Sequence, residues 1–170
     1  MIVWIDEAGF YLLAGAVRSY APRGQTPILR VPLTRDHLSV ISAITAQGQL
    51  LAAVQARAFH GGAVVRFLKH VVGHLSSRVL IIWDGAPIHH DQCVSGFVAE
   101  QGGQLCVEQL PAYAPDLNPD EGVWDQLKYV ELKNVICHEQ KELRHELRLA
   151  IARLRQKPDL ICRFIEHYGY

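Results

Sequence analysis

The apolar run at residues 79–83, Val-Leu-Ile-Ile-Trp, constrains the fold of this chain more than any other feature of its sequence. It ends directly at Asp84. An uninterrupted apolar run of this length is typical of a strand covered on both faces, as in sheets with helices on both sides. An amphipathic helix is expected before it, over 62–76, and a helix over 89–101 and a strand over 105–110 are expected after it. The middle of the chain therefore alternates between helices and strands.

The first sixty residues have the pattern of antiparallel strands. A short apolar run over 2–5 ends at Asp6, and residues 10–17 are expected to form another strand after a turn at Gly9. Runs over 38–47 and 50–59 flank Gly48 and predict a hairpin. Further helices are expected over 119–133 and 139–156. Strands first and α/β alternation afterwards predict an α/β fold: a mixed sheet, with an antiparallel meander plus parallel strands, and helices on both faces.

Length and composition favour a single soluble domain. The chain has 170 residues, of which 49% are hydrophobic and 20% charged, and these proportions exclude a disordered or coiled-coil chain. No apolar run is long enough for a membrane span, and the amino terminus lacks the features of a secretory signal, so the cytoplasm is the expected location. The four cysteines form no C-x-x-C pair and are interpreted as small buried residues.

Charge is distributed unevenly although the formal net charge is zero. Residues 1–60 carry five basic and three acidic groups, residues 61–127 three and eight, and residues 128–170 nine and six. An acidic middle between basic ends is expected if the middle binds a cation and the flanks contact a polyanion. Segregation this mild also arises by chance.

Three carboxylates occupy positions suited to a metal site. Asp6 and Asp84 each end an apolar run, so that neighbouring strands would bring both to one edge of the sheet, and Glu121 begins a helix. Clustered carboxylates repel one another unless they are protonated or bridged by a cation, and Mg²⁺ prefers such oxygen ligands. We expect Asp6 and Asp84 on adjacent strands, close enough to share one ion. The alternative for each aspartate is a turn or cap residue.

Glu121 also has a structural interpretation. The stretch Asn118-Pro119-Asp120-Glu121 matches a capping box, with Asn118 as the N-cap and Glu121 three positions later. On spacing alone the cap is favoured. Glu121 serves as a metal ligand only if its oxygens are free of the cap.

Several motifs resemble those of one family. They are IDEAGFYLLAG, APRGQTPILR, TRDHLSVISAIT, LIIWDGAPIHH and, above all, LPAYAPDLNPDEGVWDQLK. These motifs resemble the DDE transposases of the mariner superfamily, on its bacterial insertion-sequence branch, from about residue 2 to residue 165. The resemblance implies a ribonuclease H-like catalytic domain whose catalytic carboxylates, Asp6, Asp84 and Glu121, hold two divalent ions, Mg²⁺ or Mn²⁺. It implies metal-dependent cleavage of transposon DNA ends followed by strand transfer into target DNA.

The sequence departs from the family pattern at two residues of the last motif and at its amino terminus. Asp120 occupies a position that is usually apolar, and Gly122 replaces a usually larger residue. Members of the superfamily carry paired helix-turn-helix domains before the catalytic domain, whereas this chain begins five residues before Asp6. We therefore expect residues 1–170 to form a single catalytic domain, one half of a split element. A helix-turn-helix subunit or upstream frame would supply the other half, and a homodimer is a further candidate assembly.

Other residues are candidates for supporting roles. His89 follows Asp84 by about one helical turn and is a candidate accessory residue that approaches the scissile phosphate or a metal-bound water; a helix-start histidine without a role is the alternative. Asn118 is a second candidate accessory residue. The basic residues expected to contact DNA are Arg23, Lys141, Arg144, Arg148 and Arg155. Four of them form one stripe of the helix expected over 139–156, and the alternative for this stripe is a solvated helix flank.

Two other function classes remain open from the sequence. A non-catalytic transposase remnant would bind only DNA or a protein partner and would lack metal affinity. A ribonuclease H-like nuclease of another type would cut DNA without joining it. Calorimetric titration with Mn²⁺ separates the first class from a transposase, and a strand-transfer assay separates the second.

Overall fold

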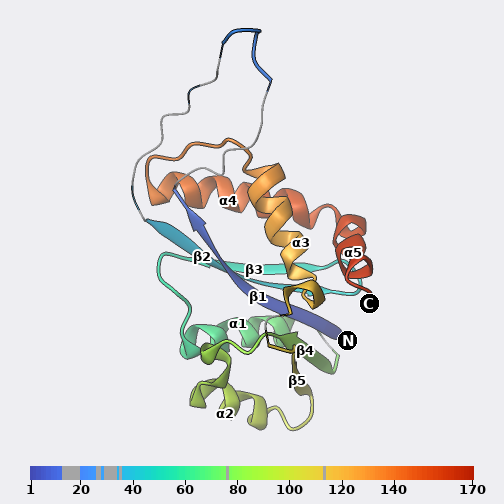
Figure 1. Cartoon of the computed structure of the whole chain (residues 1–170). Helices are drawn as coiled ribbons and strands as arrows, with labels where there is room; N and C mark the ends of the chain where they lie inside the picture. The colour runs from blue at the N-terminus through green and yellow to red at the C-terminus, as the bar shows by residue number, and fades with distance from the viewer. Residues whose placement is uncertain (13–19, 26–27, 29–33, 35, 76, 113) are drawn as a thin grey trace.

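The computed structural model describes residues 1–12, 20–25, 28, 34, 36–75, 77–112 and 114–170. A five-stranded mixed sheet in the order β3-β2-β1-β4-β5 forms its centre (Figure 1). The strands are β1 (Ile2–Tyr11), β2 (His37–Thr45), β3 (Leu50–Gln55), β4 (Val79–Trp83) and β5 (Leu105–Gln109). The first three are antiparallel, whereas β4 pairs parallel with β1 and β5 parallel with β4. The predicted meander and parallel strands are thus confirmed.

Alternation along the strands divides the core between the two faces of the sheet. On β1, Trp4 faces one side and Val3 and Ile5 face the other, and all three are almost completely buried. Because both faces of the sheet are buried, the apolar runs at residues 2–5 of β1 and 79–83 of β4 are uninterrupted. Helices therefore have to cover both faces of the sheet, as the sequence predicts.

One face is covered by α1 (Gly61–His74) and α2 (Gln92–Glu100). Buried side chains of α1 recur at helical spacing and pack on β1, β2 and β4, as expected of an amphipathic helix. A 3-10 helix, η1 (Pro87–His90), links β4 to α2. Asp91 caps α2 by accepting a hydrogen bond from the backbone N–H of Cys93 at 3.1 Å.

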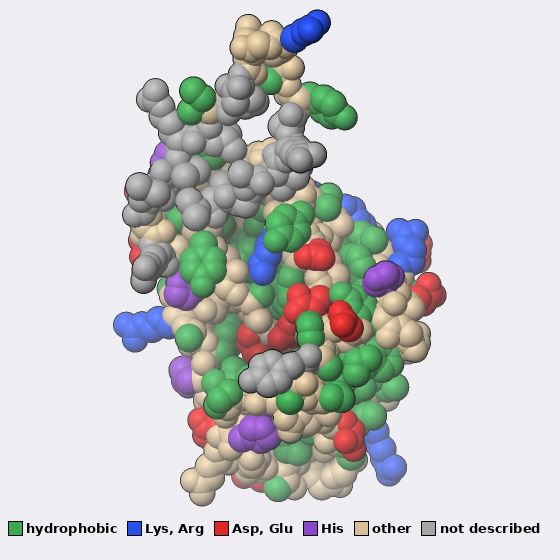
Figure 2. Space-filling view, viewed as in Figure 1, with side chains coloured by type: hydrophobic (Ala, Val, Ile, Leu, Met, Phe, Trp, Pro, Cys, Tyr) green, Lys and Arg blue, Asp and Glu red, His purple; other side chains and the backbone are tan. Residues whose placement is uncertain are grey.

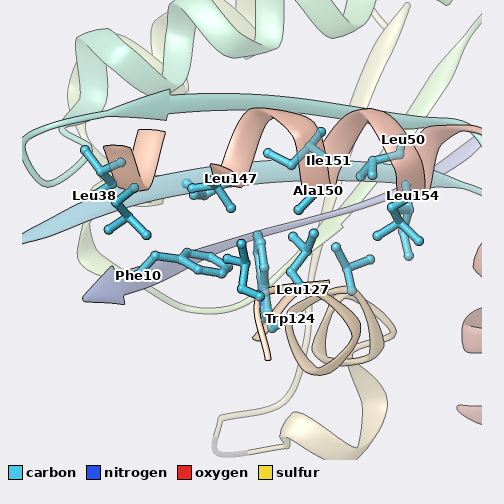
Figure 3. Packing of buried hydrophobic residues seen from close by; sticks show 14 of the residues in the cluster. Phe10, Leu38, Leu50, Trp124, Leu127, Leu147, Ala150, Ile151 and Leu154 are labelled. Atoms are coloured by element: carbon cyan, nitrogen blue, oxygen red, sulfur yellow. The ribbon is translucent and has the colours of Figure 1, made fainter. Parts of the chain in front are cut away.

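The other face is covered by α3 (Asp120–Asp125), α4 (Gln140–Arg155) and α5 (Pro158–His167), preceded by the 3-10 helix η2 (Pro115–Leu117). Figure 3 shows Trp124 beside Phe10 of β1, with Leu127 next to it, and Leu147 and Leu154 projecting from α4 toward the same cluster. A π-helix, η3 (Gln126–Glu131), continues α3. Within the described ranges, no helix is long and apolar enough to span a membrane.

The structure differs from several local predictions. Of the four cysteines that were interpreted as buried, Cys137 is buried, Cys162 is partly exposed, and Cys93 and Cys106 are exposed. Gly9 lies inside β1, paired with Ser39, so the turn expected there is wrong; the strand expected after it, over 10–17, falls mostly outside the described residues. The helix expected over 119–133 is divided into α3 and η3, because Leu132 donates its N–H to the Leu127 carbonyl, five residues back. Helix α5 had no counterpart among the predicted elements.

Candidate active site

The sheet brings Asp6 and Asp84 to neighbouring strands. Trp4 of β1 is paired with Ile82 of β4 in a parallel ladder, and Asp6 and Asp84 each lie two residues further along. The carboxyl end of β4 therefore places Asp84 beside the middle of β1, which continues as the partner of β2. This position is the edge at which α/β sheets bind ligands. The expectation that the two aspartates lie on adjacent strands is confirmed.

Asp6 is 9% exposed and is held by three hydrogen bonds. Its Oδ2 accepts from the side-chain amide of Asn118 and from the indole N–H of Trp124, each at 2.9 Å, and its Oδ1 accepts from the Glu7 backbone N–H at 2.8 Å. Burial raises the pKa of Asp6 to about 6, opposed by the hydrogen bonds from Trp124 and Glu7 and assisted by the negative charges of Glu7 and Asp84. Asp6 is thus fixed in place while its charge is only partly compensated.

Asn118 connects the start of α3 to Asp6. Its side-chain oxygen accepts from the Asp120 backbone N–H at 3.2 Å, so it does cap the helix, while its amide nitrogen donates to Asp6. The other arm of the predicted capping box is absent, because the Asn118 backbone N–H donates to the Pro115 carbonyl at 2.9 Å. The Glu121 carboxylate therefore takes no part in the cap. Its oxygens meet the condition that the sequence analysis set for a metal ligand.

Asp120 is a site residue that stands out in the sequence only as a departure from the family pattern. It is completely buried; its Oδ1 accepts from the Ser42 hydroxyl of β2, and its Oδ2 has no hydrogen-bond partner among the described residues. Burial, with added repulsion from Asp6, raises the pKa of Asp120 well above its ordinary value. A charged residue at a usually apolar position was the one sequence signal for this carboxyl.

Asp84 is half-exposed and bound to His89. Its Oδ1 lies 3.1 Å from His89 Nδ1 and accepts from the Ala86 backbone N–H at 2.9 Å. Nε2 of the same imidazole lies 3.2 Å from Glu7 Oε1. The hydrogen bond from His89 lowers the pKa of Asp84. Burial disfavours the charged imidazole, but hydrogen bonds to Asp84 and Glu7 outweigh it and raise the pKa of His89 to about 10.

A cleft of about 560 Å³ joins these groups. It is lined by Asp6, Glu7, Asp84, Asn118 and Glu121 together with residues 110–112, 114 and 115 of the loop after β5. Acidic side chains gather near the middle of the corresponding face in Figure 2. Considering only the residues that the structure describes, no three aspartate, glutamate, histidine or cysteine side chains already meet at one metal-binding point. The carboxylates share a cleft and remain separate, as uncompensated like charges favour.

The structure divides the basic stripe of α4 into two pairs. Arg144 donates to the Val54 carbonyl at 2.9 Å and Arg155 to the Leu50 carbonyl at 3.0 Å, so both are engaged with strand β3. Lys141 and Arg148 of the same helix are exposed. The remaining candidate, Arg23, is also exposed and lies in the segment 20–25, drawn in blue at the top of Figure 1, away from the sheet.

The sequence profile described as "DDE superfamily endonuclease" matches residues 1–144. The chain belongs to this family. The matched residues include Asp6, Asp84 and Glu121, the three cleft carboxylates that the sequence analysis identified. They also include the first residues of α4. A comparison with curated proteins found no match.

Solved structures share the fold of this chain. The Mos1 strand transfer complex is 18% identical with a TM-score of 0.67, and the match covers 99% of this chain and 55% of that one. The Mos1 mariner paired end complex with Mn is 16% identical with a TM-score of 0.71, over 98% and 53%. The catalytic domain of Mos1 mariner transposase is 13% identical with a TM-score of 0.60, over 99% and 83%.

These similarities confirm the ribonuclease H-like transposase fold. The chain spans about half the length of the first two of these structures.

Proposed function

We propose that this DDE endonuclease is the catalytic domain of a transposase that cleaves DNA at the ends of a mobile element and transfers the strands to target DNA, using Mg²⁺ or Mn²⁺. The observation that carries the proposal is the shared cleft, which Asp6, Asp84 and Glu121 line from three separate elements. Family membership and the fold of the Mos1 structures support the same reaction class.

The residues of the cleft fit a pair of hard divalent ions. Asp6, Asp84 and Glu121 offer only oxygen ligands, the type that Mg²⁺ and Mn²⁺ prefer. Glu7 and Asp84 place further negative charge beside Asp6, and a bound cation would compensate the charge of these carboxylates. When bound, divalent ions supply Lewis-acid stabilisation of the charge that develops during in-line displacement at a phosphate.

The chain's own residues position the ligands. Asn118 and Trp124 hold one oxygen of Asp6, and Asn118 also fixes the first turn of the helix that carries Glu121. One amide side chain therefore links the first and third carboxylates. Residues 110–112 of the loop after β5 line the same cleft and would limit how a DNA strand enters it.

The partners follow from the same proposal. The substrates are transposon ends and target DNA, and the Mos1 structures with which the chain shares its fold include a strand transfer complex and a paired end complex. Sequence-specific recognition of the ends is assigned to a helix-turn-helix part, either in the same polypeptide or in a separate subunit, and a homodimer would bring two ends together. We place the reaction in the cytoplasm of a bacterial cell.

Glu121→Gln tests the assignment. Because the cap does not use the Glu121 carboxylate, the variant should melt at the wild-type temperature without metal and should lose Mn²⁺-dependent nicking of supercoiled plasmid. Glu108→Gln, an exposed residue of β5, is the matched control and should nick normally. Transfer of a labelled oligonucleotide with a free 3′ hydroxyl into plasmid separates a transposase from a nuclease that only cuts.

If Glu121→Gln nicked plasmid as fast as the wild type, Glu121 would have a structural role and would not be a metal ligand. Absence of Mn²⁺ binding in the wild type, measured by calorimetry, would support the non-catalytic remnant. Nicking without strand transfer would support a nuclease of another type.

A further inference from the structure

A buried histidine beneath the cleft joins two of its carboxylates. The His89 side chain is 1% exposed and stacks on the Trp83 ring, with the ring centroids 4.2 Å apart and the planes 5° from parallel. His89 does not line the cleft, unlike Glu7 and Asp84. Its position favours an effect on Asp84 over direct contact with a scissile phosphate.

Within the described part of the chain, every polar atom at hydrogen-bonding distance from the imidazole is an acceptor. Nδ1 faces the Asp84 carbonyl at 2.9 Å and Asp84 Oδ1 at 3.1 Å, and Nε2 faces Glu7 Oε1 at 3.2 Å. Both ring nitrogens therefore carry hydrogen, which is the form that donates on both sides. Glu7 and Asp84 thus bind opposite ends of one rigid ring.

The ring determines where the Asp84 carboxylate lies. Asp84 is half-exposed and follows the last residue of β4, so the sheet itself does not fix its side-chain rotamer. His89 and the Ala86 backbone N–H both hold Oδ1. Trp83 prevents the imidazole from tilting, and Glu7 prevents it from rotating about its own axis.

From this geometry we infer that Glu7 and His89 are positioning residues: through the imidazole, Glu7 holds Asp84 in the orientation in which it receives a metal ion. The inference rests on the proposed function of Asp84 as a ligand. Groups that orient metal ligands in this way contribute to metal affinity without touching the ion. Glu7 therefore differs in role from Asp6, its neighbour in the sequence.

Two substitutions of Glu7 separate positioning from direct ligation. Glu7→Ala removes the acceptor from His89 and should weaken Mn²⁺ affinity by about tenfold, as loss of groups that orient metal ligands typically does. Glu7→Gln keeps an oxygen that accepts from Nε2 and should retain affinity within about threefold. Asp116→Ala, an exposed residue near the cleft but outside its lining, is the control for lost negative charge. The measurements are calorimetric titration with Mn²⁺ alone and metal-free melting of the full chain.

A second readout needs no metal. Crystal structures of the two Glu7 variants should show that Asp84 Oδ1 stays beside His89 Nδ1 in Glu7→Gln and moves away or becomes disordered in Glu7→Ala. The inference is overturned if Asp84 keeps its rotamer in Glu7→Ala, or if Glu7→Gln loses as much affinity as Glu7→Ala, which is the behaviour of a direct ligand. If the wild type binds no Mn²⁺ while the crystal structures behave as expected, the proposed function fails and the positioning role of the hydrogen bonds stands.

Discussion

Asp6 is held by specific hydrogen bonds although burial disfavours the charged form of its carboxyl. Three hydrogen bonds hold it, yet burial raises its pKa to about 6. A carboxyl whose pKa is raised by folding binds its proton more tightly in the folded state. The stability that this proton contributes is complete below the ordinary pKa of 3.8 and is lost as the pH rises through 6.

Asp6→Asn should therefore gain stability relative to the wild type as the pH rises from about 4 to about 7.5. Raising the pKa of Asp6 from 3.8 to about 6 corresponds to roughly 3 kcal/mol at complete ionisation, and about 2 kcal/mol of this falls between these two pH values. Urea unfolding at several pH values measures the difference, with the exposed Asp116→Asn as control. A difference between Asp6→Asn and wild type that is independent of pH would contradict the assignment.

At the scale of elements, Gly122 allows α3 and α5 to approach each other. A methyl group at this position would lie 2.7 Å from Cγ and 3.0 Å from Cβ of Phe164; the α5 backbone fixes Cβ, and Cγ moves only if the side chain changes its rotamer. In the sequence, Gly122 stands out only as a departure from the family pattern. The structure explains it by the contact with α5, a helix that had no predicted counterpart.

Gly122→Ala should destabilise the fold by about 1–3 kcal/mol, because overpacking outweighs the gain in helix propensity. Gly96→Ala is the matched control: this helical glycine of α2 has open space around it and should gain about 0.5–1 kcal/mol. Chemical denaturation of both variants gives the two free energies. If both variants were stabilised by the same amount, the result would show that the Phe164 side chain moves aside without a loss of stability.

Helix α4 protects one of the two edges of the sheet, the edge formed by β3. β3 is an edge strand, and unpaired edge carbonyls invite pairing with other chains unless they are covered. Arg144 and Arg155 donate to the carbonyls of Val54 and Leu50 along this edge. Two of the four stripe residues expected to contact DNA therefore have a structural partner.

Alanine variants separate the two pairs of the stripe. Arg144→Ala with Arg155→Ala should lower stability by about 1 kcal/mol per hydrogen bond removed and increase self-association. Lys141→Ala with Arg148→Ala should leave melting unchanged and reduce the salt dependence of DNA binding by about one unit of slope for each phosphate no longer neutralised. Thermal melting, light scattering and salt-titrated DNA binding distinguish these outcomes. An unchanged salt slope would remove Lys141 and Arg148 from the DNA interface.

At the scale of the whole molecule, the charge distribution predicts how the chain would bind DNA under the proposed function. The formal net charge is zero, and the cleft that would receive DNA is lined with carboxylates. Divalent cations would therefore be needed to bring phosphates into the cleft, and the remaining attraction would come from scattered surface cations.

This chain alone should bind DNA with a dissociation constant of about 1 µM or weaker, with little sequence preference and strong salt dependence. Mn²⁺ should strengthen the binding in the wild type and have less effect in Asp84→Asn. Fluorescence anisotropy with unrelated duplexes at several salt concentrations tests this. Nanomolar binding that selects one sequence would contradict it.

Local patterns in the amino-acid sequence were sufficient to predict most of the order of strands and helices and to select two candidate carboxylates, but not the third. An uninterrupted apolar run predicted β4, helical periodicity predicted α1, and the ends of apolar runs selected Asp6 and Asp84 as candidates. The motif around Glu121 identified the third carboxylate through its resemblance to a family. Where a signal is contained in neighbouring residues, no knowledge of the packing is needed to interpret it.

Contacts between distant residues, in contrast, became visible only in the folded chain. Asp120 meets Ser42 across 78 positions, and His89 meets Glu7 across 82. Arg144 reaches Val54 across 90 positions. Burial and long-range hydrogen bonds determine a side chain's charge and role, and both depend on how the sheet and helices pack, which no local pattern contains.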